Sequence, residues 1–217
     1  MFIRNLQHNM ESLFFIIVLI FSIIAHEVAH GLMADYFGDR TARNAGRLTF
    51  NPLPHIDLFG SIILPVLSVF SGLGAIIGWA KPVPYNPYNL RNQRIGESMV
   101  ASAGVMANFL LAVTFGLFYR YFSLYINPDS PFLDIALIIV TVNLSLGFFN
   151  LLPLPPFDGL RIITSIIPTF GRKILNVIDS FGNLFAIISL IIAIYIWGYI
   201  YPIVEISQRF LTGQSVL

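Results

Sequence analysis

The sequence predicts an all-α integral membrane protein, organised as a single domain over residues 1–217. Hydrophobic residues make up 56% of the chain and charged residues only 11%, whereas soluble domains carry about 25% charged residues. The mean hydropathy is +0.78, and the hydrophobic residues form runs long enough to cross a bilayer. The net charge of +1 argues against nucleic acid as a partner, and the absence of cysteine excludes disulfides and thiolate metal sites.

Four mostly apolar segments have the length of transmembrane helices, which need about 20 residues each. The first, residues 12–37, contains the uncharged stretch LFFIIVLIFSIIA. No small-residue cleavage site follows this stretch, so we expect a retained helix rather than a signal peptide. The other three cover residues 97–120, 131–152 and 180–201.

A fifth hydrophobic segment, Ser61–Trp79, is interrupted by Pro65 and several glycines, so it either crosses the membrane or enters and returns. The positions of Lys and Arg distinguish the two topologies, because cytoplasmic loops carry most of the basic residues. A full crossing divides these residues seven to five, whereas re-entry divides them nine to three. We therefore predict about four transmembrane helices with a re-entrant, or short irregular or β, segment between the first two. In this topology the protein lies in the cell membrane, with both termini on the outer side, opposite the cytoplasm. The following basic residues lie in cytoplasmic loops: Arg40, Arg43, Arg47, Lys81, Arg91, Arg94, Arg161, Arg172 and Lys173.

A His-Glu-Val-Ala-His run, His26 to His30, lies inside the first apolar segment. On a helix the two histidines are at positions i and i+4, on one face and about 6 Å apart along the axis, a spacing that lets them bind one zinc ion. Glu27 points about 100° away, where it reaches a water at the metal without being a ligand. The alternative is a pair of packing histidines beside a buried glutamate. Ionisable residues inside a membrane are costly, which favours a functional site.

A catalytic zinc site needs a third protein ligand. Asp158 is the only acidic residue between Asp134 and Asp179, and it follows the third clear apolar segment in the sequence NLLPLPPFDG. The prolines of this sequence cannot continue a regular helix, so the chain opens where a side chain could turn toward another helix. The alternative is that Asp158-Gly159 forms an ordinary turn.

Together these motifs resemble the site-2 protease family of intramembrane zinc metalloproteases. HEVAH (26–30) is followed by N-x-x-P-x-x-x-x-D-G (150–159). Further segments are similar to those of compact bacterial members: GRLTFNPLPHID (46–57), GWAKPVPYN (78–86), NLRN (89–92), and the pair AG (103–104) with Asn108. Val105 and Leu160 depart from the family pattern, which usually has Pro and Gly there, but neither is a ligand position. No segment between the motifs is long enough for the peptide-binding PDZ domain of larger relatives.

The resemblance implies a zinc metalloendopeptidase that hydrolyses peptide bonds in or near transmembrane segments of membrane proteins. One Zn²⁺ per chain would be held by His26, His30 and Asp158. Glu27 would be the general base, and Asn150 would lie near the substrate or the oxyanion. We also expect weaker substrate contacts from Asn108, Lys81 and Pro82. The expected partners are a transmembrane protein substrate and the lipid bilayer.

Two other classes of protein use intramembrane polar clusters. A metal or ion transporter would place His and acidic residues along an ion pathway, but it is expected to show repeated halves, and none is visible. An inactive membrane scaffold is expected to lack Glu27 or a ligand, and all of these are present. The segment KPVPYNP (81–87) has two interpretations, a proline-stiffened surface loop or an edge for an extended substrate peptide.

Overall fold

The computed structural model describes residues 2–63, 67, 79–127, 130–167, 171 and 183–214. Within these residues every regular element is helical and no strand occurs, which confirms the predicted all-α class. The long helices are α1 (Phe2–Tyr36), α4 (Gln93–Phe122), α5 (Pro131–Asn150) and α8 (Asn183–Thr212). The short elements are α2 (Thr41–Asn44), the 3-10 turns η1 (Leu53–His55) and η3 (Pro87–Asn89), the π-helical η2 (Leu58–Ile63), and α6 (Asp158–Ile166).

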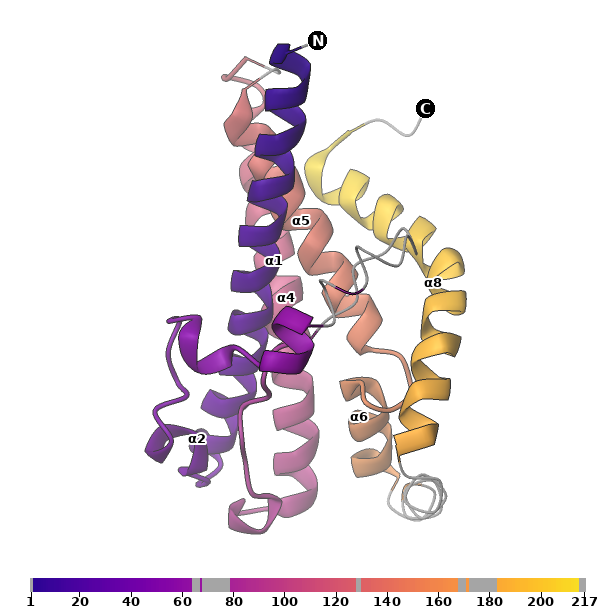
Figure 1. Ribbon diagram of the computed structural model, residues 1–217. Helices are drawn as coiled ribbons and strands as arrows, with labels where there is room; N and C mark the ends of the chain where they lie inside the picture. Colours follow the sequence, from indigo (N-terminus) through magenta and orange to yellow (C-terminus); the bar gives the residue numbers. More distant parts are fainter. Residues whose placement is uncertain are drawn as a thin grey trace.

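Four of the described helices are long and apolar enough to cross a membrane, as predicted: Ser12–Tyr36, Gln93–Phe122, Pro131–Asn150 and Ile188–Thr212. The predicted end of the last segment, residue 201, is wrong, because α8 continues to Thr212. Pro202 lies inside this helix and removes one backbone hydrogen bond without ending it. Figure 1 shows α8 bending in this part of its length, as a proline kink would produce.

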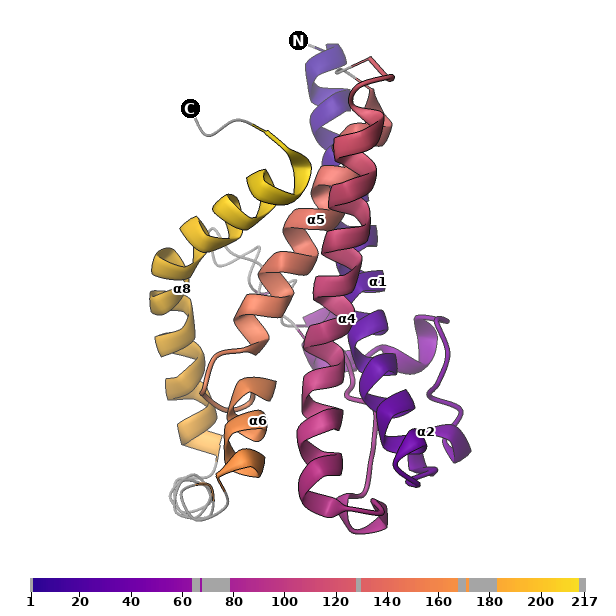
Figure 2. The same cartoon turned by 180° about the vertical axis from the view of Figure 1, so that it is seen from behind.

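The helices form a bundle in which α4 is the central element. Helices α1, α4 and α5 run side by side in both views, and α4 also contacts α6 and α8 (Figures 1 and 2). One apolar core joins three of these helices through Ala112, Val140, Leu144 and Val204. Both termini lie at one end of the molecule, and α2 and α6 lie at the other (Figure 1).

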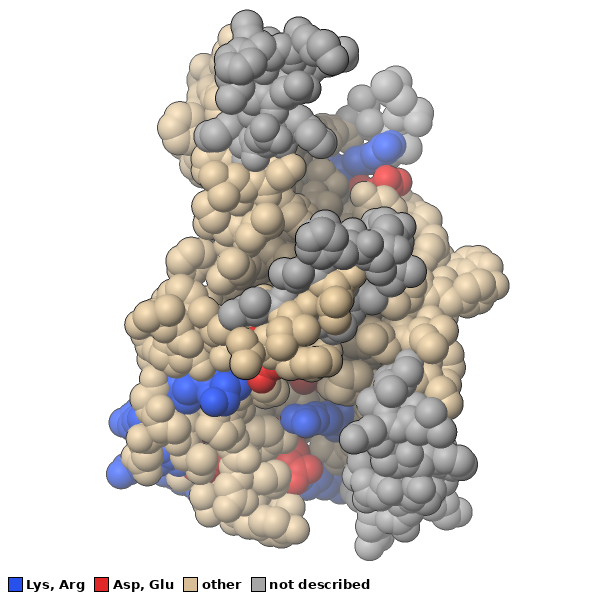
Figure 3. Space-filling model, in the orientation of Figure 1, with Lys and Arg blue, Asp and Glu red and all other residues tan. Residues whose placement is uncertain are grey.

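The Lys and Arg side chains gather mainly at the end of the molecule where α2 and α6 lie (Figure 3). Most of the Ser61–Trp79 segment, residues 64–66 and 68–78, lies outside the described residues, so its predicted re-entry stays a prediction. The described parts on either side of it are in contact, because the Trp79 N–H donates to the Gly60 carbonyl at 3.0 Å and Ser61 Oγ donates to the Trp79 carbonyl at 2.9 Å.

Candidate metal centre

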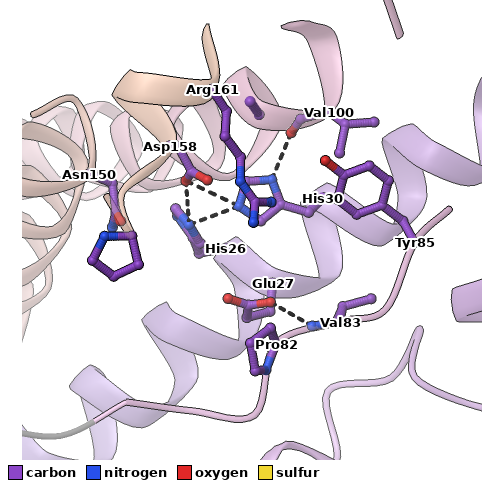
Figure 4. Close-up of a pocket in the computed structure, with 12 residues that line it drawn as sticks. His26, Glu27, His30, Pro82, Val83, Tyr85, Val100, Asn150, Asp158 and Arg161 are labelled. Atoms are coloured by element: carbon purple, nitrogen blue, oxygen red, sulfur yellow. Dashed lines mark hydrogen bonds and ion pairs between the residues drawn. The ribbon is translucent and has the colours of Figure 1, made fainter. Parts of the chain in front are cut away.

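Three of the predicted site residues come together from two helices. His26 and His30 lie one turn apart on α1, and Asp158 is the first residue of α6. Asp158 Oδ2 lies 3.0 Å from His26 Nε2 and 3.2 Å from His30 Nε2, and the two Nε2 atoms are 3.0 Å apart. All three residues are buried, with exposed fractions of 6% for His26, 9% for His30 and 8% for Asp158. Figure 4 shows the three groups converging on one point.

The hydrogen bonds on the far side of each imidazole fix its tautomer. His30 Nδ1 lies 2.6 Å from the Val100 carbonyl, which can only accept, so Nδ1 carries the proton. His26 Nδ1 lies 2.6 Å from Asn108 Oδ1. The Asn108 amide nitrogen is already donating to Asn143 Oδ1 at 2.9 Å, so the oxygen of Asn108 faces His26 and accepts its proton. Both Nε2 atoms therefore direct lone pairs at Asp158.

Two imidazole lone pairs and a carboxylate oxygen repel one another unless a cation lies between them. Asp158 Oδ2 is buried and has no hydrogen-bond donor among the described residues, consistent with three mutually facing acceptors. Ligands about 2.0–2.1 Å from a tetrahedral zinc ion are about 3.3 Å from each other. The observed separations of 3.0–3.2 Å are close to that value. The chemistry and spacing of these groups thus fit a zinc ion, and a fourth position is left for water or substrate.

A polar network inside the apolar bundle supports His26. Asn143 Nδ2 donates to Ser22 Oγ at 2.9 Å and to the Ile139 carbonyl at 2.9 Å, which leaves its oxygen to accept from Asn108. Asn108 and Asn143 are both completely buried. The predicted substrate contact of Asn108 stays a prediction, and the covered side chain with its oxygen bound to His26 favours a supporting role instead.

Glycines let the backbone of neighbouring elements approach this centre. A Cβ atom at Gly104 of α4 would lie 2.5 Å from His30 Nε2 and 2.7 Å from His26 Nε2. A Cβ atom at Gly159 would collide with the carbonyl of Leu151, at the end of α5. The AG and DG pairs noted in the sequence are thus required by packing. Gly104 makes room for the metal-facing nitrogens, and Gly159 lets the Asp158 turn lie against α5.

Glu27 is held by the KPVP segment (residues 81–84) rather than by the three converging residues. Its Oε2 accepts a hydrogen bond from the Val83 N–H at 2.8 Å. Oε1 has no hydrogen-bond partner in the part of the chain that the structure describes, so it is free to accept a proton. Arg47, which is 7% exposed, holds the same segment in place by donating to the Lys81 carbonyl at 2.7 Å and the Pro82 carbonyl at 3.3 Å.

Asp39 fixes the other end of this segment. Its carboxylate is completely buried and accepts hydrogen bonds from the Asn86 N–H at 2.6 Å and from Asn89 Nδ2 at 2.8 Å, as well as from Thr41. Burial raises the pKa of Asp39, but the hydrogen bonds from Thr41, Asn89 and Asn86 outweigh that effect and lower the pKa below its ordinary value. Residues 81–89 are thus tied to the end of α1.

A cavity of about 200 Å³ opens beside the three converging groups. Of the remaining predicted residues, Asn150 and Pro82 line it together with Glu27, whereas Lys81 does not. Asn150 Nδ2 donates to the Leu146 carbonyl at 3.0 Å, which leaves its second amide hydrogen available to the cavity. His55 lies outside this cavity lining; it is 2% exposed and contacts the Thr49 carbonyl at 3.0 Å through Nε2.

Sequence reasoning missed two groups of residues in this region. Tyr85 and Arg161 line the cavity on its His30 side (Figure 4). The position of Arg161, three residues after Asp158, was a usable signal. Asn143 and Ser22 were also missed, although an asparagine in the apolar 131–152 segment is itself a signal for an interhelical contact.

Comparisons with known proteins agree with the geometry. The family model described as Peptidase family M50 matches residues 14–128 and 127–196. The chain is 38% identical over 174 residues to the protein named "Putative zinc metalloprotease YwhC" of Bacillus subtilis, covering 78% of this chain and 76% of that protein. It is 30% identical over 178 residues to "Putative zinc metalloprotease Rip2" of Mycolicibacterium smegmatis, covering 78% of this chain and 63% of the relative.

A more distant relative is "Putative zinc metalloprotease Rip3" of Mycobacterium tuberculosis, with 29% identity over 147 residues, which are 68% of this chain and 29% of the relative. No solved structure matches the chain significantly. The family match spans most of the sequence, including both helices that carry the converging groups. The chain therefore belongs to peptidase family M50, the site-2 protease family of zinc metalloproteases, and its cofactor is Zn²⁺.

Proposed function

We propose that this multi-pass membrane protein is an intramembrane zinc metalloprotease that hydrolyses peptide bonds in or near the transmembrane segments of other membrane proteins. The observation that carries the proposal is the convergence of three acceptor atoms, from His26, His30 and Asp158, beside the free oxygen of Glu27. These three residues would hold the ion. When bound, Zn²⁺ supplies the Lewis acidity that polarises water and the scissile carbonyl.

The protein's own groups account for the proton transfers of the reaction. Val83 holds Oε2 of Glu27, so Oε1 accepts the proton of the attacking water and passes it to the leaving amine. The second amide hydrogen of Asn150 donates to the carbonyl oxygen as negative charge develops there. One water molecule and one peptide bond thereby give a carboxylate and an ammonium group.

A transmembrane substrate must unwind before its carbonyls are accessible, because a helix satisfies them internally. Pro82 and Pro84 keep the segment at residues 81–86 from forming a helix, and Val83 and Tyr85 line the cavity beside Glu27. The Tyr85 N–H has no hydrogen-bond partner among the described residues. This segment would pair with an extended substrate peptide, an interpretation favoured over that of a passive surface loop by its contact with Glu27.

The proposed topology places residues 38–96 and 153–179 in the cytoplasm and both termini outside. The contact between Gly60 and Trp79 supports re-entry, since a segment whose two ends are hydrogen-bonded returns to the place where it starts. The gathering of basic side chains at the end opposite the termini supports the sidedness (Figures 1 and 3). Single cysteines at Asn44 and Asn89 should be labelled from the same side of the membrane. Labelling from opposite sides would exclude re-entry.

Purified Glu27→Gln protein tests the enzymatic proposal. The variant should retain zinc, because Glu27 is not a ligand, and should lose peptide cleavage that is sensitive to chelators in the wild type. The Asp158→Ala variant should instead lose most of its zinc. If the wild-type protein moves metal ions across liposome membranes but cleaves no peptide, the protease proposal is wrong and the protein is a transporter.

A further inference from the structure

Arg161 brings a positive charge to the rim of the cavity. It lies on α6 three residues after Asp158, so the two side chains share one face of the helix. Among the described residues that line the cavity, it is the only Lys or Arg. Figure 4 shows its side chain reaching from α6 toward the His30 side of the site.

The guanidinium of Arg161 lies beside the Tyr85 ring and has no counter-ion among the described residues. Its central carbon lies 6.0 Å from the centre of the Tyr85 ring, and Tyr85 packs against the buried cluster of Ala34, Leu90 and Val100. Burial raises the pKa of Tyr85, so the ring stays neutral. No ion pair of Arg161 occurs within the described part of the chain. Arg161 also forms a hydrogen bond with the Tyr85 hydroxyl. A guanidinium carries five N–H donors, so others remain for a planar acceptor.

The difference in exposure between the two histidines and Arg161 indicates which group of the substrate Arg161 binds. His26 and His30 are less than 10% exposed, whereas Arg161 is exposed. A group that stabilises the oxyanion must work where water is excluded, at the buried metal. A cation at the rim instead meets a side chain of the substrate residue next to the reacting bond, and a carboxylate matches the forked geometry of a guanidinium.

We propose that Arg161 determines specificity by binding the side-chain carboxylate of a substrate Asp or Glu close to the scissile bond. The inference rests on the proposed protease function. Tyr85 would hold the guanidinium in position, and a bound peptide would cover the ion pair and strengthen it.

A peptide library tests this directly. Zinc-loaded protein in detergent is given transmembrane peptides that differ only in having Glu, Gln, Lys or Leu at each position across the cleaved region, and the products are identified by mass spectrometry. With wild-type protein, Glu at one position near the cleavage site should give a kcat/KM about tenfold above Gln. Arg161→Lys should retain a weaker preference, Arg161→Gln should lose it, and Arg161→Glu should favour Lys instead. The matched control, Arg40→Glu, changes an exposed arginine outside the cavity and should behave as wild type.

The zinc content of each variant shows whether the site is intact. Chelator-sensitive cleavage with no preference for acidic residues would overturn the inference and leave the protease function standing, as would the same preference in the wild type and in Arg161→Gln. If wild-type protein cleaves no peptide in a chelator-sensitive way, the proposed function fails, and the inference fails with it.

Discussion

Replacing Gly104 with alanine should remove most of the bound zinc without unfolding the helices. The added Cβ would lie 2.5 Å from His30 Nε2 and 2.7 Å from His26 Nε2. Ordinary van der Waals contact begins at about 3.4 Å, so the two nitrogens and the α4 backbone would have to separate by roughly 0.7–0.9 Å. Zinc sites tolerate changes in ligand distance of only about 0.2 Å. The displacement is several times that tolerance, and both nitrogens are affected together.

Overpacking of this kind costs roughly 1–3 kcal/mol of stability, and we expect zinc affinity to fall by at least about 100-fold. Affinity is measured by competition with a chromophoric chelator, and helix content by circular dichroism. Gly198→Ala is the matched control, because Gly198 is also a helical glycine and an added Cβ there would meet nothing within 4 Å. Wild-type zinc affinity in Gly104→Ala would refute the assignment of these two nitrogens as ligands.

Three further predictions concern residues that position the centre. Asn108→Ala should lower zinc affinity about 10–100-fold in the same competition assay, because His26 loses the acceptor that fixes its tautomer, and unchanged affinity would contradict that role. Asn143→Ala leaves the Asn108 amide with a poorer acceptor and should destabilise the protein by about 1–3 kcal/mol in thermal unfolding, with a smaller loss of zinc than Asn108→Ala. The lowered pKa of Asp39 means that its carboxylate stabilises the fold above about pH 4, the ordinary pKa of aspartate, and that this contribution is lost as pH falls further. The unfolding temperature of the wild type should therefore drop more steeply between pH 5 and 3 than that of Asp39→Asn, and parallel curves would contradict this.

The transmembrane helices could be predicted from sequence because apolar length is a local property. Runs of about 20 apolar residues are sufficient to locate all four spans. The end of the last span was harder, since Pro202 and the more polar residues after it are typical of a helix end in water. In α8 the helix continues through Pro202 because a proline costs less where neighbouring helices and local adjustments satisfy the freed groups.

The residues of the candidate metal centre also divide into those that a local sequence pattern reveals and those that only the packing of helices brings together. His26 and His30 are recognisable because their spacing along one helix is itself the signal. Their hydrogen-bond partners Val100 and Asn108 lie on α4, more than 60 residues along the chain, and only the packing of α4 against α1 brings them into place. The sequence pattern therefore marked Asn108 as significant, but it could not distinguish a substrate contact from a support for His26.

The arrangement around α1 links the position of Glu27 to contacts far from the proposed zinc ligands. Glu27 is held by Val83, whose segment is held by Arg47 on one side and by the buried carboxylate of Asp39 on the other. Asp39 lies three residues after the end of α1, so the helix that carries the two histidines also fixes the segment that holds Glu27, the proposed base. The same segment contributes Tyr85, on which Arg161 rests, and Arg161 belongs to the helix that begins at Asp158. Because one short irregular segment contacts both the proposed base and the proposed specificity residue, a substrate that pairs with it would be aligned with the reacting groups and with Arg161 at the same time.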